Sequence, residues 1–455
     1  MAQQKEEGVG GGRAIGRRLT RQDFLLLSAG AGLALAGCGG GPQNNPAVQG
    51  GSAGGGGKEY KGPKVTLEFW NGFTGGDGSF IQKMVEQFSS EHKNVQVKMN
   101  IIEWADYYQK VPTAVASGNG PDVGIMHCDQ LGTNAARNVI IPLDPVAKAL
   151  NLKESDFYPT VWEAGLYNGQ RYGIPLDMHP LALYYNRDLL AKAGTDKPPQ
   201  TKDEYMSICK ELKAKGIQGA WVSPMFFTGS LQFMSLIWQY GGDLYNNDVS
   251  KATFNSDAGV EALSWMVSLV KDGYSPKNVA QDAELTAFQN GKNALHWNGI
   301  WNIIPFGELK DLNWGVAPLP KIGGGGGAWS NTHQFVMMRQ SNPDPNKMAA
   351  SKFFINWISE HSLEWAKSAK IPARKSVRDS AAFKKELPKE AEVAKELPYI
   401  HFPPSVPGIF DVETASYDQA VNEAVLLKKD PKTALDEAAS RANDLLEENR
   451  QKYEG

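Results

Sequence analysis

Apolar and polar positions alternate in two stretches near the start of the main body of the chain, which predicts two β-strands. The alternation runs through residues 65–69 and again through 95–101. Apolar side chains recur at helical spacing over 80–88, a second helix is predicted over 107–116, and an apolar run at 122–126 predicts a third strand. This order with short connections predicts right-handed crossovers and a parallel sheet.

The carboxyl ends of parallel strands meet at one rim of a sheet, and ligands of such sheets bind at that rim. This rule places the loop at 71–78 and the segment at 127–131 beside each other. A binding site is therefore expected where these two segments meet.

The second part of the chain is mostly helical in its pattern. A strand is predicted over 183–186, and Thr201 is a favourable helix N-cap because its hydroxyl accepts a hydrogen bond from a free backbone N–H. Five consecutive glycines at 323–327 exclude regular structure before a predicted strand at 333–338. Helices are predicted over 201–215, 230–240, 257–271, 281–290 and 432–449.

Residues 1–37 have the pattern of an export signal peptide. Arginines precede a short apolar run at 24–36, which is too short to span a bilayer. The run ends in Leu-Ala-Gly-Cys, which resembles the lipobox of bacterial lipoproteins and implies lipidation of Cys38. The basic region also resembles a twin-arginine signal, although Gln22 stands where the second arginine would be. Twin-arginine and general secretory export both remain open.

The segment 38–63 is rich in Gly, Asn, Gln, Ser and Pro and has no apolar periodicity. Such composition predicts a flexible tether between the lipidated cysteine and the folded body. The protein is therefore expected at the membrane surface, held by its lipid.

Composition and charge narrow the function further. Hydrophobic residues make up 41% of the 455 residues, which predicts a sizeable buried core, and the net charge of -3 argues against nucleic-acid binding. Beyond Cys38, the chain has only Cys128 and Cys209. These two either form one disulfide or remain two buried thiols, and the second alternative is favoured.

Seven short motifs spread over residues 64–445 resemble those of the family 1 extracellular solute-binding proteins, which include the sugar-binding subunits of ABC importers. The motifs are FWNGF at 69–73, ASGNGPDV at 116–123, YGIP at 172–175, LYYNRDL at 183–189, NGIW at 298–301, WGVAPLP at 314–320 and IPARKSV at 371–377. Each is weak alone, but together they follow the order of the family.

The resemblance implies an α/β fold of two hinge-connected lobes, like the type II periplasmic binding proteins. We expect chain crossings near Asp177, Trp314 and Lys375. Lobe one would then comprise 64–177 plus 316–375, and lobe two 178–315 plus 376–455.

The function implied by the resemblance is the capture of a sugar or oligosaccharide by hinge closure and its delivery to an ABC permease. The protein would act as a monomer on the outer face of the bacterial cytoplasmic membrane, in the periplasm or at the cell surface. It would need no cofactor and catalyse no reaction.

A sugar site needs aromatic faces for the C–H surfaces of the ring and fixed polar groups for the hydroxyls. The candidates in lobe one and at the crossings are Phe73, Thr74, Asp77, His127, Asp129, Asp177, His179, Trp329, His333 and Arg374. The candidates in lobe two are Phe226, Trp297, Asn298, Trp301 and Phe410. We expect at least one of Trp297 and Trp301 to stack on the ligand.

Several of these residues have competing interpretations. Arg374 either holds two hydroxyls or forms an ion pair at the hinge, and Asp177 either accepts from a hydroxyl or belongs to a hinge salt bridge. Phe226 is either a platform or a core residue, and Trp238, on an apolar helix, is expected in the core.

Other functions are less favoured. The seven histidines are scattered, and the neighbourhood of His127 lacks the spaced partners of a zinc site, so no metal site is expected. Tyr184 and Tyr185 resemble the paired tyrosines of ferric-iron-binding proteins, but they lie inside a structural motif of sugar binders. A polyol, glycerol-phosphate or peptide ligand remains an alternative, and a carbohydrate-active enzyme is the least favoured.

Overall fold

The structure is a computed structural model that describes residues 57–454. The predicted signal peptide, Cys38 and most of the predicted tether lie outside the described residues. Among the described helices, none is both long enough and apolar enough to cross a membrane.

The first sheet contains the parallel strands that the alternating pattern predicts. Its order is β2-β1-β3-β11-β6. Strand β1 (Val65–Asn71) runs parallel to β2 (Val95–Ile101) and to β3 (Val123–His127). Strand β11 (His333–Met337) then adds antiparallel to β3 and joins β6 (Ile174–Pro175). The predicted parallel unit is thus confirmed, and a strand from far along the chain completes it.

Helices cover this sheet because their apolar faces match the buried faces of the strands. Helix α1 (Gly78–Glu91) buries Ile81, Met84, Val85 and Phe88. The Phe88 ring lies 5.1 Å from Phe354 of α12 (Pro345–Glu360), measured between ring centroids. Further helices and strands around this sheet are α2 (Trp104–Ala116), α3 (Cys128–Ala136), α4 (Asp144–Ala149), α5 (Pro159–Glu163), β4 (Leu166–Tyr167), β5 (Gln170–Arg171) and α13 (Ser362–Ala366).

The second sheet is organised around β7 (Asp177–Asn186), whose ten residues are all buried. Its order is β12-β7-β10-β13, with β8 and β9 also pairing with β7. The bounds of these partners are β8 (Leu295–Gly299), β9 (Trp314–Ala317), β10 (Ala328–Asn331), β12 (Ile371–Pro372) and β13 (Ile400–His401). A strand buried on both faces reads as a nearly continuous apolar run, so only its second half shows in the sequence as a strand.

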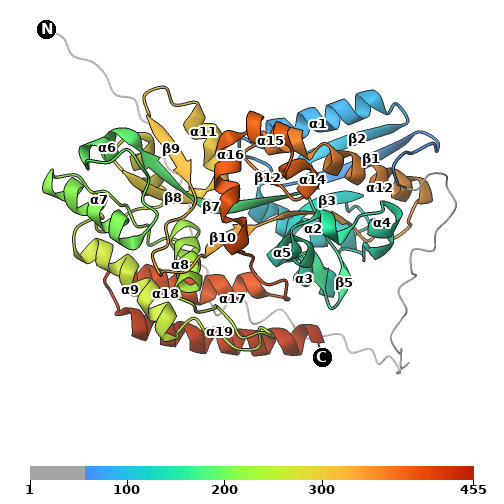
Figure 1. Cartoon of the computed structure of the whole chain (residues 1–455). Helices are drawn as coiled ribbons and strands as arrows, with labels where there is room; N and C mark the ends of the chain where they lie inside the picture. The colour runs from blue at the N-terminus through green and yellow to red at the C-terminus, as the bar shows by residue number, and fades with distance from the viewer. Residues whose placement is uncertain (1–56, 455) are drawn as a thin grey trace, which may run out of the picture. The chain divides into compact units, whose positions relative to one another are not determined.

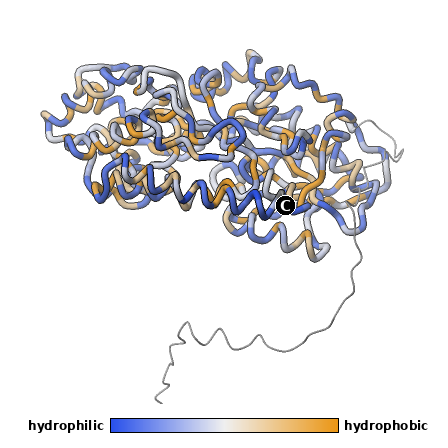
Figure 2. The backbone as a smooth tube through the Cα atoms, turned by 90° about the horizontal axis from the view of Figure 1, so that it is seen from below, coloured by the Kyte–Doolittle hydropathy of each residue, from blue (hydrophilic) through white to orange (hydrophobic). Residues whose placement is uncertain are grey.

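Helices surround the second sheet, as Figure 1 shows. They are α6 (Arg187–Lys192), α7 (Lys202–Ala214), α8 (Thr228–Gln239), α9 (Asp257–Lys271), α10 (Ala283–Gln289), α11 (Ile303–Gly307), α14 (Lys375–Arg378), α15 (Ala381–Glu386), α16 (Pro388–Val393), α17 (Ile409–Ala415), α18 (Tyr417–Val425) and α19 (Pro431–Glu454). Thr201 caps α7 in a full capping box with Glu204. The five predicted helices are all present. Figure 2 shows hydrophilic colour along much of α19.

The chain passes between the two sheets at points that strand pairing defines. One passage lies between β6 and β7, at the predicted position near Asp177. Both β9 and β10 hydrogen-bond to β7, so the return to the first sheet occurs at Thr332, between β10 and β11. Within the range 316–331, which is expected to begin a lobe-one segment, the residues of β9 and β10 pair in the second sheet.

Cys128 and Cys209 are both buried and free. The favoured alternative of two buried thiols is confirmed.

A buried carboxyl group in α18 makes a testable contribution to stability. Burial raises the pKa of Asp418 to about 7, partly offset by the Ser230 hydroxyl. Because the pKa in the folded protein lies above its unfolded value, the folded state binds more protons than the unfolded state between about pH 4 and pH 7. Stability contributed by this group is therefore present at acid pH and is lost as the pH rises through that range.

We expect Asp418→Asn to remove this loss, since the amide stays neutral. The free energy of unfolding of the variant should exceed that of the parent by about 2–4 kcal/mol at pH 8, and the gap should close below about pH 4. Urea denaturation at both pH values measures this difference. The exposed Asp106→Asn is the control, and an equal gap at both pH values would contradict the prediction.

Candidate functional site

The centre of the candidate site is a carboxylate buried where the two sheets meet. Asp177 begins β7 and has no exposed surface. It accepts hydrogen bonds from His179 Nδ1 at 3.1 Å, from His333 Nδ1 at 2.8 Å, from the His333 backbone N–H at 3.2 Å and from Trp365 Nε1 at 2.6 Å. A buried carboxylate is tolerated only with such compensation, so Asp177 holds the groups around it in defined positions.

Three histidines surround this carboxylate on three different strands. His127 ends β3, His333 begins β11 directly opposite it, and His179 lies in β7. The ring centroids are 4.3 Å apart for His179 and His333, 4.9 Å for His127 and His333, and 5.5 Å for His127 and His179. We define Asp177 and these histidines as the junction cluster.

The electrostatics of the junction cluster favour neutral imidazoles at His127 and His179 beside an ionised Asp177. Burial acts to raise the pKa of Asp177, but the charge of His333 and the hydrogen bonds from both histidines hold it well below its usual value. Burial lowers the pKa of His179 to about 4, and burial together with the neighbouring histidines lowers the pKa of His127 well below its usual value. At neutral pH His127 and His179 are therefore uncharged.

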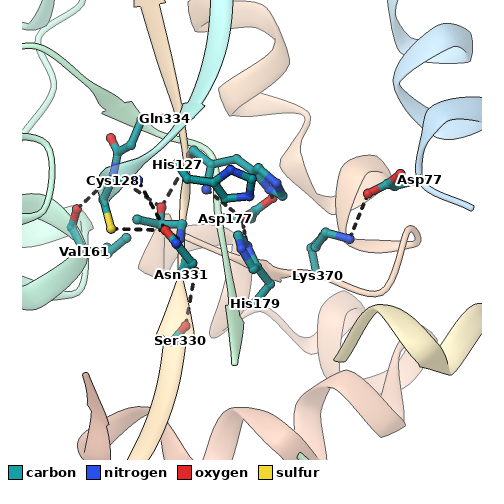
Figure 3. A network of polar contacts seen from close by, with 12 residues as sticks. Asp77, His127, Cys128, Val161, Asp177, His179, Ser330, Asn331, Gln334 and Lys370 are labelled. Carbon is teal, nitrogen blue, oxygen red and sulfur yellow. Dashed lines mark hydrogen bonds and ion pairs between the residues drawn. The ribbon is translucent and has the colours of Figure 1, made fainter. Parts of the chain in front are cut away.

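Asp129 belongs to a polar network that joins α3 to β10. Figure 3 shows Cys128 and Asn331 of this network beside the junction cluster. Its Oδ1 accepts from Asn331 Nδ2 at 2.9 Å, while Asn331 Oδ1 accepts from the backbone N–H of Cys128 at 3.2 Å. Burial raises the pKa of Asp129, and the hydrogen bond from Asn331 opposes that rise.

The loop after β1 brings further candidates to the junction cluster. The Phe73 ring lies 4.8 Å from the His333 ring and 4.6 Å from Trp365, measured between centroids. Asp77 pairs at 3.2 Å with the Nζ of Lys370, a lysine that is only 2% exposed. Thr74 is exposed in the same loop.

Aromatic rings continue from the junction cluster along the second sheet and end at the molecular surface. Trp301 lies 6.1 Å from His179, 6.4 Å from Trp329 and 5.5 Å from Phe227. Phe226 lies 6.2 Å from Phe227 and 6.0 Å from Phe410. We define these five residues, Trp301, Trp329, Phe227, Phe226 and Phe410, as the aromatic surface.

Three of these rings are exposed to a degree that is unusual for phenylalanine. The exposed fraction is 46% for Phe226, 39% for Phe227 and 40% for Phe410. Large apolar side chains gathered on the surface mark a binding site more often than single exposed ones do. Trp329 is buried, so it supports the surface from below.

The backbone at Phe227 is strained. It precedes α8 with φ of +80° and ψ of -77°, a region that is rare for a residue with a side chain. Phe227 thereby directs its ring against Trp301. Strain of this kind persists only where the surrounding structure holds it, and it concentrates at functional sites.

The structure separates three candidates from this site. Trp297 lies in β8 and packs against Trp265 of α9, so of the two indoles in this segment only Trp301 reaches the aromatic surface. Asn298 is buried, and its side-chain amide forms a hydrogen bond with His296 and accepts another from the Gly299 backbone N–H. Arg374 pairs with Asp156 at 3.5 Å and donates to Ser359, so the structure favours the ion-pair alternative.

The structure also adds residues that the candidate set lacks. One of them is Phe227, which directly precedes the apolar helix α8. Trp104 lies 4.5 Å from His127, while Trp365 and Lys370 contact the junction cluster and Asp77 from late in the chain. No local pattern indicates those last two contacts.

A second groove, of about 890 Å³, is lined by other residues. It is formed by segments 160–168, 238–249 and 398–407, and none of the predicted ligand-binding residues lines it. Its size alone would suit a small ligand, but the strained and exposed aromatic residues lie elsewhere.

Comparison with known proteins identifies the family. The profile of the bacterial extracellular solute-binding proteins matches residues 72–364. The chain belongs to this family. A galactooligosaccharide-binding protein from Bacillus subtilis is 24% identical over 438 residues, which cover 92% of this chain and 95% of that relative.

Solved structures of similar fold agree with this assignment. The cyclic α-maltosyl-1,6-maltose binding protein from Arthrobacter globiformis has a TM-score of 0.74 at 23% identity, covering 85% of this chain and 100% of that one. UgpB from Mycobacterium tuberculosis in complex with glycerophosphocholine has a TM-score of 0.73 at 18% identity, with 85% and 99% covered. The predicted two-lobed α/β fold of the periplasmic binding proteins is thus confirmed.

We expect Asp177→Asn to destabilise the protein strongly. The amide presents an N–H₂ group to partners that are all donors, so at least one buried donor loses its acceptor. The free energy of unfolding should fall by about 3 kcal/mol in urea denaturation at pH 7. The exposed Asp203→Asn should change it by less than about 0.5 kcal/mol, and equal stability of the two variants would contradict the role of Asp177.

Proposed function

We propose that this protein captures a carbohydrate outside the cytoplasm and delivers it to the permease of an ABC importer. The observation that carries this proposal is the aromatic surface, which continues directly into the polar junction cluster. Stacking faces and fixed hydrogen-bonding groups side by side are what a sugar ring requires.

The rings supply part of the binding energy. Each stacked ring contributes about 0.5–1.5 kcal/mol by analogy with aromatic pairs. A micromolar dissociation constant needs about 8 kcal/mol, so hydrogen bonds to groups such as Asp129 and His179 must supply much of the remainder. The ligand would touch groups from both sheets at once.

Capture would work by a shift between open and closed forms. His127 and Asp129, beside the first sheet, and Trp301 and Phe227, beside the second, would engage one ligand together only when the lobes are closed. Such differential affinity moves the population toward the closed form. The permease would then recognise that form.

The charges near the site favour a neutral ligand over a glycerol phosphate. Lys370 is already paired with Asp77, and Arg374 with Asp156. The carboxylate of Asp177 adds negative charge at the same place. A phosphate would need unpaired cations there, whereas sugar hydroxyls can use acceptors and donors alike.

The structure also disfavours ferric iron as the ligand. Tyr184 is buried and donates its hydroxyl to the Gly299 carbonyl at 2.8 Å. Tyr185 lies beneath the guanidinium of Arg187, with 5.1 Å between that group and the ring centroid. Neither tyrosine belongs to the junction cluster or to the aromatic surface.

A binding screen tests the proposal. Mono- and oligosaccharides that bind the folded state should raise the melting temperature of the mature chain in a concentration-dependent way. Trp301→Ala should then weaken the binding of the best ligand about 3- to 10-fold in calorimetry, because it removes one stacking face. The exposed Tyr399→Ala, 42% exposed and outside the aromatic surface, is the matched control. Stabilisation by glycerophosphodiesters but by no saccharide would overturn the proposal.

Phe227→Gly separates ligand binding from folding. Glycine adopts positive φ without strain, so this variant should be at least as stable as the parent while it loses about 3- to 10-fold in ligand affinity. Thermal unfolding and calorimetry on the same preparation measure both quantities. Unchanged affinity would remove Phe227 from the site.

We also propose that the protein is anchored by lipid on Cys38. In the native host, Cys38→Ala should leave the protein in the soluble fraction after export, since the thioether carrying the lipid cannot form. Fractionation and metabolic labelling with a radioactive fatty acid measure the change. Membrane retention of the unlabelled variant would contradict the proposal.

A further inference from the structure

The junction cluster has a second chemical capacity, because its histidines bring three ring nitrogens together. One ring nitrogen from each of His127, His179 and His333 can be chosen so that the three nitrogens lie within 4.8 Å of one another. Among residues 57–454 this is the one group of His, Cys, Asp or Glu with that geometry. Imidazole is the most common protein ligand for transition metals.

Each of these rings already has a partner for its Nδ1 atom. Asp177 accepts from Nδ1 of His179 and of His333, and a carboxylate has no proton to donate, so both rings carry their proton on Nδ1. In the neutral form of each ring, the lone pair that a metal ion would use is then on Nε2. This is the arrangement in which a carboxylate orients a metal-binding histidine.

His127 is oriented by Tyr108 in a similar way. The Tyr108 hydroxyl lies 2.7 Å from His127 Nδ1 and accepts the His127 backbone N–H at 3.0 Å. Metal binding at Nε2 would select the tautomer in which Nδ1–H donates to this hydroxyl. No hydrogen bond within the described residues involves Nε2 of any of the three histidines.

We propose that His127, His179 and His333 bind one divalent transition-metal ion of the zinc class, with a fourth coordination position open to solvent or ligand. Three protein ligands and one open position are a common arrangement for zinc. Three imidazoles and no coordinating oxygen favour zinc, cobalt, nickel or copper over magnesium and calcium.

The distances require only a small adjustment. Nitrogens around a tetrahedral zinc with bonds of 2.0–2.1 Å lie about 3.4 Å apart. The ring nitrogens lie within 4.8 Å of one another, so they must approach by at most about 1.4 Å. The facing register of His127 and His333 on β3 and β11 holds two of the ligands on paired strands.

The surrounding charges permit a cation. The Asp177 carboxylate lies behind two of the rings and offsets part of the charge of the ion. Lys370 opposes binding, but Asp77 neutralises it at 3.2 Å. The cluster therefore presents a negative balance to an incoming ion.

This inference does not rest on the proposed carbohydrate function, although the two sites adjoin, since His179 lies 6.1 Å from Trp301.

Cobalt spectroscopy and zinc calorimetry test the inference on the mature chain after chelator treatment, without sugar present. We expect one equivalent of Co²⁺ per chain with visible d–d absorption, displaced by one equivalent of Zn²⁺. His127→Gln should weaken zinc binding at least 100-fold, and His92→Gln, outside the cluster, should leave it unchanged. His127 is preferred for this test because its replacement leaves the hydrogen bonds to Asp177 intact.

A second pair of variants keeps the test decisive if His127→Gln does not fold. Tyr108→Phe removes only the orienting hydroxyl and should weaken zinc binding about 10- to 100-fold. Tyr107→Phe, one residue earlier on α2, is the matched control, because its hydroxyl makes no hydrogen bond to a histidine. Retention of full zinc affinity in Tyr108→Phe and His127→Gln, or no cobalt spectrum at millimolar metal, would overturn the inference.

The saccharide screen is carried out separately in the presence of chelator. A failure of every saccharide there would count against the proposed function alone. The metal proposal is decided by zinc binding to the histidine variants.

Discussion

The structure depends on the cost of burying the Asp177 carboxylate where its two sheets meet. A charge without exposed surface requires several donors, and Asp177 has them in His179, His333 and Trp365. These donors come from β7, β11 and α13, so satisfying one carboxylate aligns elements that are far apart along the chain. The same hydrogen bonds place a proton on Nδ1 of His179 and of His333 and so set the orientation of both rings.

The aromatic surface shows a different physical device. Phe227 is held in a strained backbone conformation, and Phe226 and Phe410 are left exposed, although each would be more stable in a core. The strained residue and the two exposed rings lie next to one another, beside polar groups that come from both sheets. A ligand with flat apolar faces and many hydroxyls would offset these free-energy costs by covering the rings and bonding to the polar groups. Carbohydrate is therefore the ligand that this family member suits best.

The polar and the aromatic parts of the site constrain each other. Neutral imidazoles at His127 and His179 can act as acceptors for hydroxyl groups or as ligands for a metal ion. In either case the charge of Lys370 is neutralised by Asp77. The buried carboxylate and the paired lysine therefore offer no unpaired cation for an anionic ligand at this cluster. Choice among sugars would depend on the exposed rings, whose spacing can follow the length of an oligosaccharide.

The sequence by itself determined the local elements and the family, because strand alternation, helix spacing, caps and short motifs are read within a few residues. It correctly indicated the parallel unit, the capping of α7 by Thr201 and the rim formed by 71–78 and 127–131. Only the tertiary structure decided that Trp301 reaches the aromatic surface while Trp297 packs in the core. Trp297 lies within β8, and Trp301 lies in the turn that follows this strand. The tertiary structure also brought together histidines that are scattered along the chain, because contacts between distant strands leave no periodic trace in the sequence.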